Sequence, residues 1–446
     1  MSRLSLSANE SVLLAGELFL LLINFQKYFA IGMQGEAHFQ DGYDLIILGL
    51  SRWDNALNSS TFNIAKEFAR THRVFYIDKP FSYKDYIQEK KLSPIHSRKD
   101  AIRSGKNYCR KLETDGVSFY VVTPRMCLPI NFLPDGRLYD WVSLYNRRLV
   151  TEVIQRLIHD FSIRSYVFFN SFLPTYFDVL RPNMLQPLVK VYRSCDNISQ
   201  EKYIARHGVR LEKQAAKEAD LVLASSFMLQ KNLELVSNRI VHRVANAADP
   251  EIFSCPSPQN LIRPKEIRSI RGKMLLYTGR LSNLRIDYEL LVKIAKARPF
   301  DTLVLVGLFD EWDLVKYGLR TFTNVVIVGL KPVKALREFL AFSDLTLIPF
   351  KKNTLTESIY PLKINEYLAA GKPVVSTNFS EDIRTFIPHI SVADSHEGFL
   401  GAIDRELHEF TEQKSKSLIA LGQQNTWAHR GKEFRELIHE AILKRS

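Results

Sequence analysis

The chain has 446 residues, more than one hydrophobic core usually supports, so we expect two domains. Its 46% hydrophobic and 24% charged residues are ordinary for a globular protein, and no segment is low in complexity or repeated. The 61 Lys and Arg residues exceed the 48 Asp and Glu residues by 13, which suits a nucleic acid, an anionic membrane surface or a phosphorylated ligand. The four cysteines are scattered without metal-ligand spacing, so a disulfide framework is not expected and a reducing compartment fits better.

The N-terminal segment over residues 12–31 is rich in Leu and Phe, but polar residues interrupt it. Its longest apolar run, residues 18–23, is far shorter than the roughly 20 residues that a membrane-spanning helix needs. We therefore treat residues 1–40 as an extension with two interpretations. It is either an interfacial helix or a segment that the native protein lacks, with translation starting at Met33.

Short apolar runs alternate with segments of helical period from Tyr43 onward. Near-continuous apolar strands joined by helices indicate a parallel sheet that is covered on both faces. Ser59 and Ser60 are good N-caps for a helix over residues 61–71. The strands predicted for this first domain, residues 41–255, cover residues 44–49, 73–78, 117–122, 165–169, 189–192, 221–224 and 240–244.

Prolines and alternating charges interrupt this pattern over residues 256–273, which we interpret as an interdomain linker. A second α/β domain follows over residues 274–420, and a helical segment over 410–445, anchored by Trp427, provides a C-terminal helix in residues 421–446. The chain is thus predicted to hold two tandem Rossmann-like, doubly wound domains whose strand ends face a common cleft. The strands of the second domain are predicted over residues 274–277, 302–306, 324–328, 345–348, 373–376 and 390–392.

The segment from Ser358 to Val375 carries the most informative chemistry. Pro361 suits the first turn of a helix and Gly371 suits its end, so free N–H groups at the helix start can bind a diphosphate. Lys363 adds a positive charge in that turn, and Glu366 can accept hydrogen bonds from ribose hydroxyls. The alternative is that Lys363 and Glu366 form an ordinary solvated pair on the helix.

The run from Pro361 to Val375 resembles the donor motif of GT-B glycosyltransferases, close to the retaining group 1/4-like families. Those families carry two Glu residues separated by seven positions before an Ala-Ala-Gly-Lys-Pro-Val run. Glu366 matches the second Glu, which holds the donor ribose in the family. The first Glu, which contacts the sugar, falls at Ser358, with Glu357 one position away, so the resemblance fixes neither the sugar nor the stereochemistry.

A second resemblance lies in the run from Leu276 to Arg285, which is similar to the family's strand, Gly-Arg loop and following basic residue. In the family the two cations bind the donor diphosphate and stabilise the leaving nucleotide, a role that Arg280 and Arg285 inherit as catalytic residues. Two such cations can replace a divalent metal, so no metal and no cofactor are expected. For Arg285 taken alone, a surface arginine is the alternative. The donor-binding residues implied in this way are Gly279, Arg280, Arg285, Ser358, Tyr360, Pro361, Leu362, Lys363 and Glu366.

The resemblance covers roughly residues 43–400 and is most specific over 274–375. Asn246 and Asp249 match a family Asn-Gly-x-Asp stretch, with Ala247 in place of Gly. The resemblance implies a GT-B fold and a metal-independent enzyme of polysaccharide biosynthesis for the cell envelope. Such an enzyme moves sugar from a nucleotide-diphosphate donor to a polysaccharide or lipid-linked glycan.

The acceptor half of the sequence offers fewer signals. Asp54 follows the first strand and Asp196 follows the strand at 189–192, so each can serve as an acceptor base. Capping or loop hydrogen bonding is the alternative for both.

Residues 84–111 hold nine Lys or Arg against three acidic residues. They can dock on an anionic lipid surface near a lipid-linked acceptor, or they form a solvated loop. We expect a cytoplasmic protein, peripheral at the inner face of the membrane.

Two other functions compete with glycosyl transfer. A nucleotide-sugar 2-epimerase of the same fold needs several acid/base carboxylates and His residues in the cleft, a set that the sequence does not reveal. A non-enzymatic basic binding protein is the second alternative. We expect no nucleic-acid partner.

Overall fold

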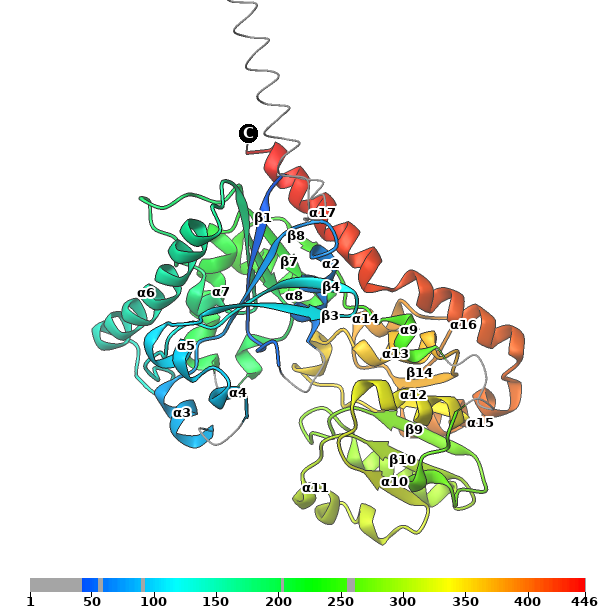
Figure 1. Cartoon of the computed structure of the whole chain (residues 1–446). Coiled ribbons are helices and arrows are strands. Elements are labelled where there is room, and N and C mark those ends of the chain that lie inside the picture. The colour runs from blue at the N-terminus through cyan, green and yellow to red at the C-terminus, as the bar shows by residue number, and fades with distance from the viewer. Residues whose placement is uncertain (1–41, 55–58, 90–92, 202–203, 255–260, 446) are drawn as a thin grey trace, which may run out of the picture. The chain divides into compact units, whose positions relative to one another are not determined.

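The computed structural model describes residues 42–54, 59–89, 93–201, 204–254 and 261–445 (Figure 1). All elements reported below belong to one compact unit, Tyr43–Ser446. The predicted extension over residues 1–40 lies outside the described residues, as do Lys90, Lys91 and the first part of the predicted linker.

The N-terminal sheet has eight strands in the order β3-β4-β2-β1-β5-β6-β7-β8. Every neighbouring pair is parallel except β3 and β4. Seven of the strands confirm the predictions from the apolar runs. The strands are β1 (Asp44–Gly49), β2 (Val74–Asp78), β3 (Cys109–Thr114), β4 (Val117–Val122), β5 (Tyr166–Ser171), β6 (Val189–Ser194), β7 (Leu221–Ala224) and β8 (Val241–Arg243).

Strand β3 is the strand that the sequence analysis missed. It lies at the sheet edge, and exposed Arg110, Lys111 and Glu113 replace the apolar run that marks the buried strands. It pairs antiparallel with β4 through a turn in which Asp115 and Gly116 both have positive φ, 48° and 74°. An Asp-Gly pair between two extended segments is a strong hairpin signal, so the turn residues contained the missing information.

Helices cover both faces of the N-terminal sheet. On β1, Ile46 and Leu48 pack in the same core as α6, whereas Leu45 and Ile47 pack in the core that contains α2 and α17. This alternation is the reason that the strand is apolar throughout. The helices of this part are α2 (Ser60–Phe68), α3 (Tyr83–Glu89), α4 (Ser93–His96), α5 (Lys99–Ser104), α6 (Arg137–Asp160), η1 (Pro174–Tyr176), η2 (Ile198–Gln200), α7 (Ala205–Glu218) and α8 (Phe227–Ser237).

The C-terminal sheet has six parallel strands in the order β11-β10-β9-β12-β13-β14, and all six were predicted. The strands are β9 (Met274–Thr278), β10 (Thr302–Val306), β11 (Val325–Val328), β12 (Leu345–Ile348), β13 (Val374–Thr377) and β14 (Ser391–Ala393). The helices here are η4 (Lys265–Ile267), α10 (Tyr288–Ala297), α11 (Glu311–Lys316), η5 (Leu319–Thr321), α12 (Val333–Phe342), η6 (Thr356–Ser358), α13 (Leu362–Ala369), α14 (Glu381–Arg384) and α15 (His396–Glu409). Helix α9 (Pro250–Phe253) precedes them in the chain and packs against α12 and α13 in the C-terminal core.

The described part of the predicted linker is not a free connection. Ile267 and Ile270 are buried in the core of the C-terminal sheet, so this stretch belongs to the second α/β layer. Proline content hid these two apolar anchors from the sequence analysis.

The C-terminal segment over residues 410–445 is two helices rather than one, α16 (Glu412–Gln424) and α17 (Trp427–Leu443). The predicted boundary between residues 420 and 421 therefore falls inside α16. Thr426 separates the helices and caps α17 by accepting a hydrogen bond from the His429 N–H. Helix α16 packs closely on α13 at Gly422. A Cβ added there would lie only 2.7 Å from the Ala369 backbone nitrogen.

Helix α17 returns to the N-terminal sheet and covers it beside α2 (Figure 1). The Phe434 ring lies 5.9 Å from the Phe169 ring of β5 and 6.5 Å from the Phe68 ring of α2, between centroids. The last helix of the chain is therefore part of the first hydrophobic core.

Phe434→Ala should lower the free energy of unfolding by about 3–5 kcal/mol, because Phe434 is fully buried in that core. Urea denaturation measures this change. Phe300→Ala is the matched control, since the Phe300 side chain is 90% exposed and its removal should leave stability unchanged. Equal stability of the two variants would mean that α17 does not contribute to the core.

Candidate functional site

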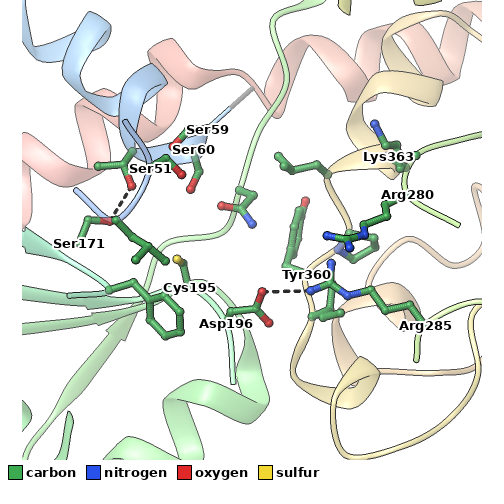
Figure 2. A pocket seen from close by; sticks show the side chains of 18 of the residues that line it. Ser51, Ser59, Ser60, Ser171, Cys195, Asp196, Arg280, Arg285, Tyr360 and Lys363 are labelled. Atoms are coloured by element: carbon green, nitrogen blue, oxygen red, sulfur yellow. Dashed lines mark hydrogen bonds and ion pairs between the residues drawn. The ribbon is translucent and has the colours of Figure 1, made fainter. Parts of the chain in front are cut away.

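A cavity of about 320 Å³ lies between residues of the N-terminal sheet's loops and residues of the C-terminal sheet's loops. Its lining comes mainly from segments that follow the carboxyl ends of parallel strands, the edge at which such sheets bind ligands. Figure 2 shows serine side chains on one side of this space and basic side chains on the other. The two sides differ in chemistry, so they are described separately.

The basic side of the cavity, called here the cationic wall, consists of Arg280, Arg285 and Lys363. The two arginines follow β9, whereas Lys363 is in the first turn of α13. These are the three cations that the sequence analysis predicted for a diphosphate site. The structure brings them to one cavity although about 80 positions separate them along the chain.

Gly279 lets the chain turn sharply into the arginine loop. Its φ is 142°, a backbone conformation that disfavours side chains, and an added Cβ would lie 2.8 Å from the Tyr277 hydroxyl. A Cβ added at Gly307 would lie only 1.9 Å from the Gly279 carbonyl oxygen. The loop after β9 therefore needs glycine at position 279, and the chain after β10 needs glycine at position 307 so that the two segments can approach each other.

Helix α13 presents its N-terminus beside the cationic wall. Pro361 is the N-cap rather than the first helical residue, and its own side chain makes no cap hydrogen bond. Pro361, Leu362 and Lys363 all line the cavity. The free N–H groups and the dipole of the first turn therefore add positive potential to the same space.

Glu366 pairs with Lys363 one turn along α13. The Lys363 Nζ lies 2.9 Å from Oε2 and 3.2 Å from Oε1 of Glu366. The two side chains are 23% and 9% exposed, so this is a half-buried pair and not the solvated pair of the alternative interpretation. Lys363 lines the cavity, whereas Glu366 is not one of its lining residues. The ribose role of Glu366 stays a prediction.

Ser358 is placed away from the cavity. Its hydroxyl donates to the Thr354 carbonyl at 3.0 Å and accepts from the Asn197 amide at 3.1 Å. The Ser358 carbonyl accepts from the Ser226 hydroxyl at 2.7 Å. The predicted donor contact is therefore replaced by a connection between the two sheets, because the residue is only 1% exposed and its groups are already bonded.

Tyr360 does line the cavity, but its hydroxyl bonds to the Asn365 Oδ1 of α13 at 3.1 Å. Burial raises the pKa of Tyr360 to about 12, partly offset by that hydrogen bond. The hydroxyl therefore stays protonated at neutral pH.

Asp196 reaches across the cavity to the cationic wall (Figure 2). Its Oδ2 lies 3.3 Å from an Arg285 guanidinium nitrogen, and Glu201 lies 3.8 Å from the same nitrogen. Burial is the largest cause of a raised pKa of Glu201, followed by the nearby Asp196 charge, while Arg285 and Arg280 lower it. In this arrangement Asp196 is a counter-ion of Arg285.

Asp54, the other predicted base, is not among the residues that line the cavity. It forms an ion pair with Arg98, whose guanidinium also donates to Asp78 at 2.7 Å. Burial raises the pKa of Asp78 to about 7, and the Arg98 charge opposes that shift. Asp54 therefore belongs to a charge cluster under the loop after β1, and the structure corrects its assignment as an acceptor base.

The side of the cavity opposite the cations, called here the hydroxyl wall, was missed as a group. Ser59 and Ser60 were predicted only as helix N-caps, and the sequence analysis did not single out Ser171. The other members come from the loop after β1 and the start of α2, so no local pattern connects them. The hydroxyl wall consists of Ser51, Ser59, Ser60, Thr61 and Ser171.

Two absences hold for the residues that the structure describes. Among them, no three His, Cys, Asp or Glu side chains come together in a way that could hold a metal ion. No described helix combines the length and apolar character that a bilayer span requires.

Residues 272–409 match the family model described as Glycosyl transferases group 1. This segment, called here the group 1 domain, is similar to the members of that family. The match includes β9, the cationic wall and α13, which confirms the family resemblance inferred from these motifs.

One curated relative is TuaH of Bacillus subtilis (strain 168), named for a glycosyltransferase role in teichuronic acid biosynthesis. The two proteins are 28% identical over 185 residues, which is 40% of this chain. The match spans 45% of the length of that relative.

Solved structures with the same architecture include the sucrose-phosphate synthase of Thermosynechococcus elongatus, with a TM-score of 0.63 at 14% identity over 90% of this chain and 100% of that one. An Escherichia coli trehalose-6-phosphate structure bound with UDP-2-fluoro glucose has a TM-score of 0.63 at 10% identity, covering 89% of this chain and 99% of that one. Anabaena HepE in complex with UDP and glucose has a TM-score of 0.56 at 15% identity, with the same coverage. These similarities confirm the predicted GT-B fold of two Rossmann-like sheets.

Proposed function

We propose that the chain is a glycosyltransferase that moves a sugar from a nucleoside-diphosphate donor to a polysaccharide or lipid-linked glycan acceptor. The observation that carries this proposal is the cationic wall, three basic side chains that line one cavity beside the N-terminus of α13. A diphosphate is the ligand that such an arrangement favours, because its charge is spread over several oxygens. The group 1 domain match over the same residues supports the assignment.

The proposed chemistry breaks the bond between the anomeric carbon and a diphosphate oxygen. Negative charge then builds on the leaving nucleoside diphosphate. Fixed cations in a partly desolvated site stabilise that charge, so Arg280, Arg285 and Lys363 supply what a divalent metal supplies elsewhere. Glu366 holds Lys363 in position and is the candidate for the ribose contact.

Donor binding has a consequence for Asp196. A diphosphate on Arg285 competes for the guanidinium that Asp196 now contacts at 3.3 Å. Its arrival releases a carboxylate on the acceptor side of the cavity, where it can accept a proton from an acceptor hydroxyl. We propose Asp196 as the acceptor-side base for this reason.

The named relatives support the substrate classes. HepE was solved with UDP and glucose, another neighbour with UDP-2-fluoro glucose, and TuaH carries the name of a polysaccharide pathway. We propose the cytoplasmic side of the membrane as the place of action.

The 2-epimerase alternative has less support. Among the described residues that line the cavity, Asp196 is the one carboxylate and there is no histidine. Several acid/base groups are needed to invert a carbon centre, so this lining suits transfer better than epimerisation.

Glu366→Ala should weaken UDP binding by about 1.5–3 kcal/mol if the carboxylate accepts ribose hydroxyls, as expected for hydrogen bonds to a charged group. Calorimetry with UDP and GDP measures the loss and shows which base the site prefers. Glu397→Ala is the matched control, because Glu397 pairs with Lys293 on other helices and does not line the cavity. An unchanged affinity in Glu366→Ala would remove this residue from the donor site.

EDTA should leave UDP binding and transferase activity unchanged, because the cationic wall neutralises the diphosphate. Arg280→Gln and Arg285→Gln should each lower kcat by about 10²–10³, the range for losing one donor to a developing charge. Activity that disappears with EDTA and returns with magnesium or manganese would contradict this prediction.

Duplex DNA should not raise the Tm of the protein at physiological salt, whereas UDP or GDP should raise it.

We also propose that the basic segment over residues 84–111 contacts an anionic lipid surface. The structure changes which of its cations can take part. Arg98 is 7% exposed and is paired with Asp54 and Asp78, so it is not available to lipid. Exposed cations remain at Lys84, Lys99, Arg103, Lys106, Arg110 and Lys111.

Replacing Lys99, Arg103 and Lys106 by Gln should lower co-sedimentation with phosphatidylserine vesicles, since each basic residue near such a surface contributes roughly 1 kcal/mol. High salt should have the same effect. UDP binding should persist. The control replaces Arg271, Lys296 and Lys316, which are exposed and lie outside the basic segment, by Gln, which keeps the change in net charge the same. If both triple variants sediment alike, the basic segment is a solvated surface.

A further inference from the structure

Arg193 is a fully buried cation behind the cavity. It lies in β6 with no exposed surface, and it forms no ion pair with any Asp or Glu that the structure describes. Arg98, also buried, shows the usual arrangement, because two carboxylates pair with it. Burying an ion without a counter-charge costs desolvation free energy. The folded chain therefore bears this cost to keep a positive charge at Arg193.

The hydrogen-bond partners of Arg193 all line the cavity. One terminal nitrogen donates to the Ser60 and Ser171 hydroxyls at 3.3 and 3.4 Å, and the other donates to the Asn246 Oδ1 at 2.9 Å. The Nε of Arg193 has no hydrogen-bond partner among the described residues. The guanidinium therefore lies directly behind the hydroxyl wall.

These bonds limit the directions in which the hydroxyl groups can donate. An arginine only donates, so Ser60 and Ser171 must use their oxygens as acceptors toward it. The Ser60 hydrogen is then left to donate elsewhere. Ser171 also shares a 2.8 Å hydrogen bond with the Thr61 hydroxyl. If Ser171 donates in that bond, the Thr61 hydrogen is the one left for the cavity. The wall thus offers donors and is backed by a buried positive charge.

The start of α2 adds to the same potential. Ser60 is the first helical residue, and the side chain of the N-cap Ser59 makes no cap hydrogen bond. First-turn N–H groups without a side-chain cap, together with the helix dipole, favour an anion at this position. The Arg193 guanidinium, the hydroxyl hydrogens and the N-terminus of α2 each add positive potential to the same part of the cavity.

We infer that the hydroxyl wall binds an oxyanion, a phosphate or a carboxylate, that is carried by the acceptor. The inference rests on the proposed function and specifies its acceptor as an anionic glycan or sugar phosphate. The donor diphosphate already has its own cations on the opposite wall, so a second anion site facing it matches a second substrate. The donor's own phosphate is the other source of the same chemistry, and the test separates the two.

The test uses the full chain saturated with UDP, so that the cationic wall is occupied. Inorganic phosphate is titrated at constant ionic strength against chloride, and thermal unfolding reports binding because a ligand of the folded state raises the Tm. The main variant is the double substitution Ser60→Ala and Ser171→Ala, which removes the hydroxyls and keeps Arg193. Arg193→Met is the second variant. Ser194→Ala is the matched control, because Ser194 is a buried serine of β6 that bonds to Glu212 and does not line the cavity.

Wild type and Ser194→Ala should bind phosphate alike, and the double variant should bind it about tenfold more weakly or worse, as expected for lost hydrogen bonds to a charged group. UDP affinity should be the same in all three. Equal phosphate binding in wild type and the double variant would overturn the inference. A parallel loss of UDP affinity in the double variant would also overturn it, since the anion would then be the donor's phosphate.

Failure of UDP to bind wild type would contradict the proposed function and not this site. In that case the phosphate titration is run without nucleotide on the Arg280→Gln variant. Phosphate binding that survives there and disappears in the Ser60→Ala, Ser171→Ala variant would still place the anion at the hydroxyl wall, whereas the reverse pattern would refute it.

Discussion

The arrangement of parallel strands is the constraint on which the whole site depends. Parallel strands run in the same direction and are joined by crossover connections. The loops that follow the strands therefore all emerge at the same end of the sheet. The N-terminal sheet places Ser51, Ser171 and Asp196 at its edge in this way, and the C-terminal sheet places Arg280 at its own. Residues distant in sequence meet because the topology leaves their loops no other side. The loops at the carboxyl ends of the two sheets are enough to form the cavity.

Much of this could be predicted from sequence because buried parallel strands are apolar on both faces and therefore conspicuous. Strand β3 escaped because it is an exposed edge strand, and its information lay in the turn at Asp115 and Gly116. The cationic wall was predictable because its residues lie in two contiguous motifs. The hydroxyl wall was not, because common Ser and Thr residues from three separate segments form it. Asp54 was misassigned because its partner Arg98 lies 44 positions along the chain, in a segment with no recognisable pattern.

Charge compensation separates the structural cations of this protein from the functional ones. Arg98 is buried between two carboxylates and stabilises the loop region after β1. Arg285 has carboxylates at 3.3 and 3.8 Å but remains half-buried at the cavity, a pairing that a phosphate can displace. Arg193 has hydroxyl, amide and thiol partners, and no carboxylate of the described residues forms an ion pair with it. The net charge of +13 indicated an anionic partner, and the local pairing of each arginine shows where its positive charge is not already neutralised.

The return of α17 to the N-terminal sheet affects how the protein is made. Trp427, Phe434 and Ile438 complete a core whose strands, β1 to β7, all end about 200 residues or more before α17 begins. While the ribosome is still translating the group 1 domain, the face of the N-terminal sheet beside α2 lacks this cover and exposes apolar side chains. Domains usually fold in the order in which they leave the ribosome. Here the N-terminal α/β domain emerges first, but its core is complete only when α17 has been added. The nascent chain therefore carries an open hydrophobic face until α17 has been made, and this face is a surface that a chaperone can bind.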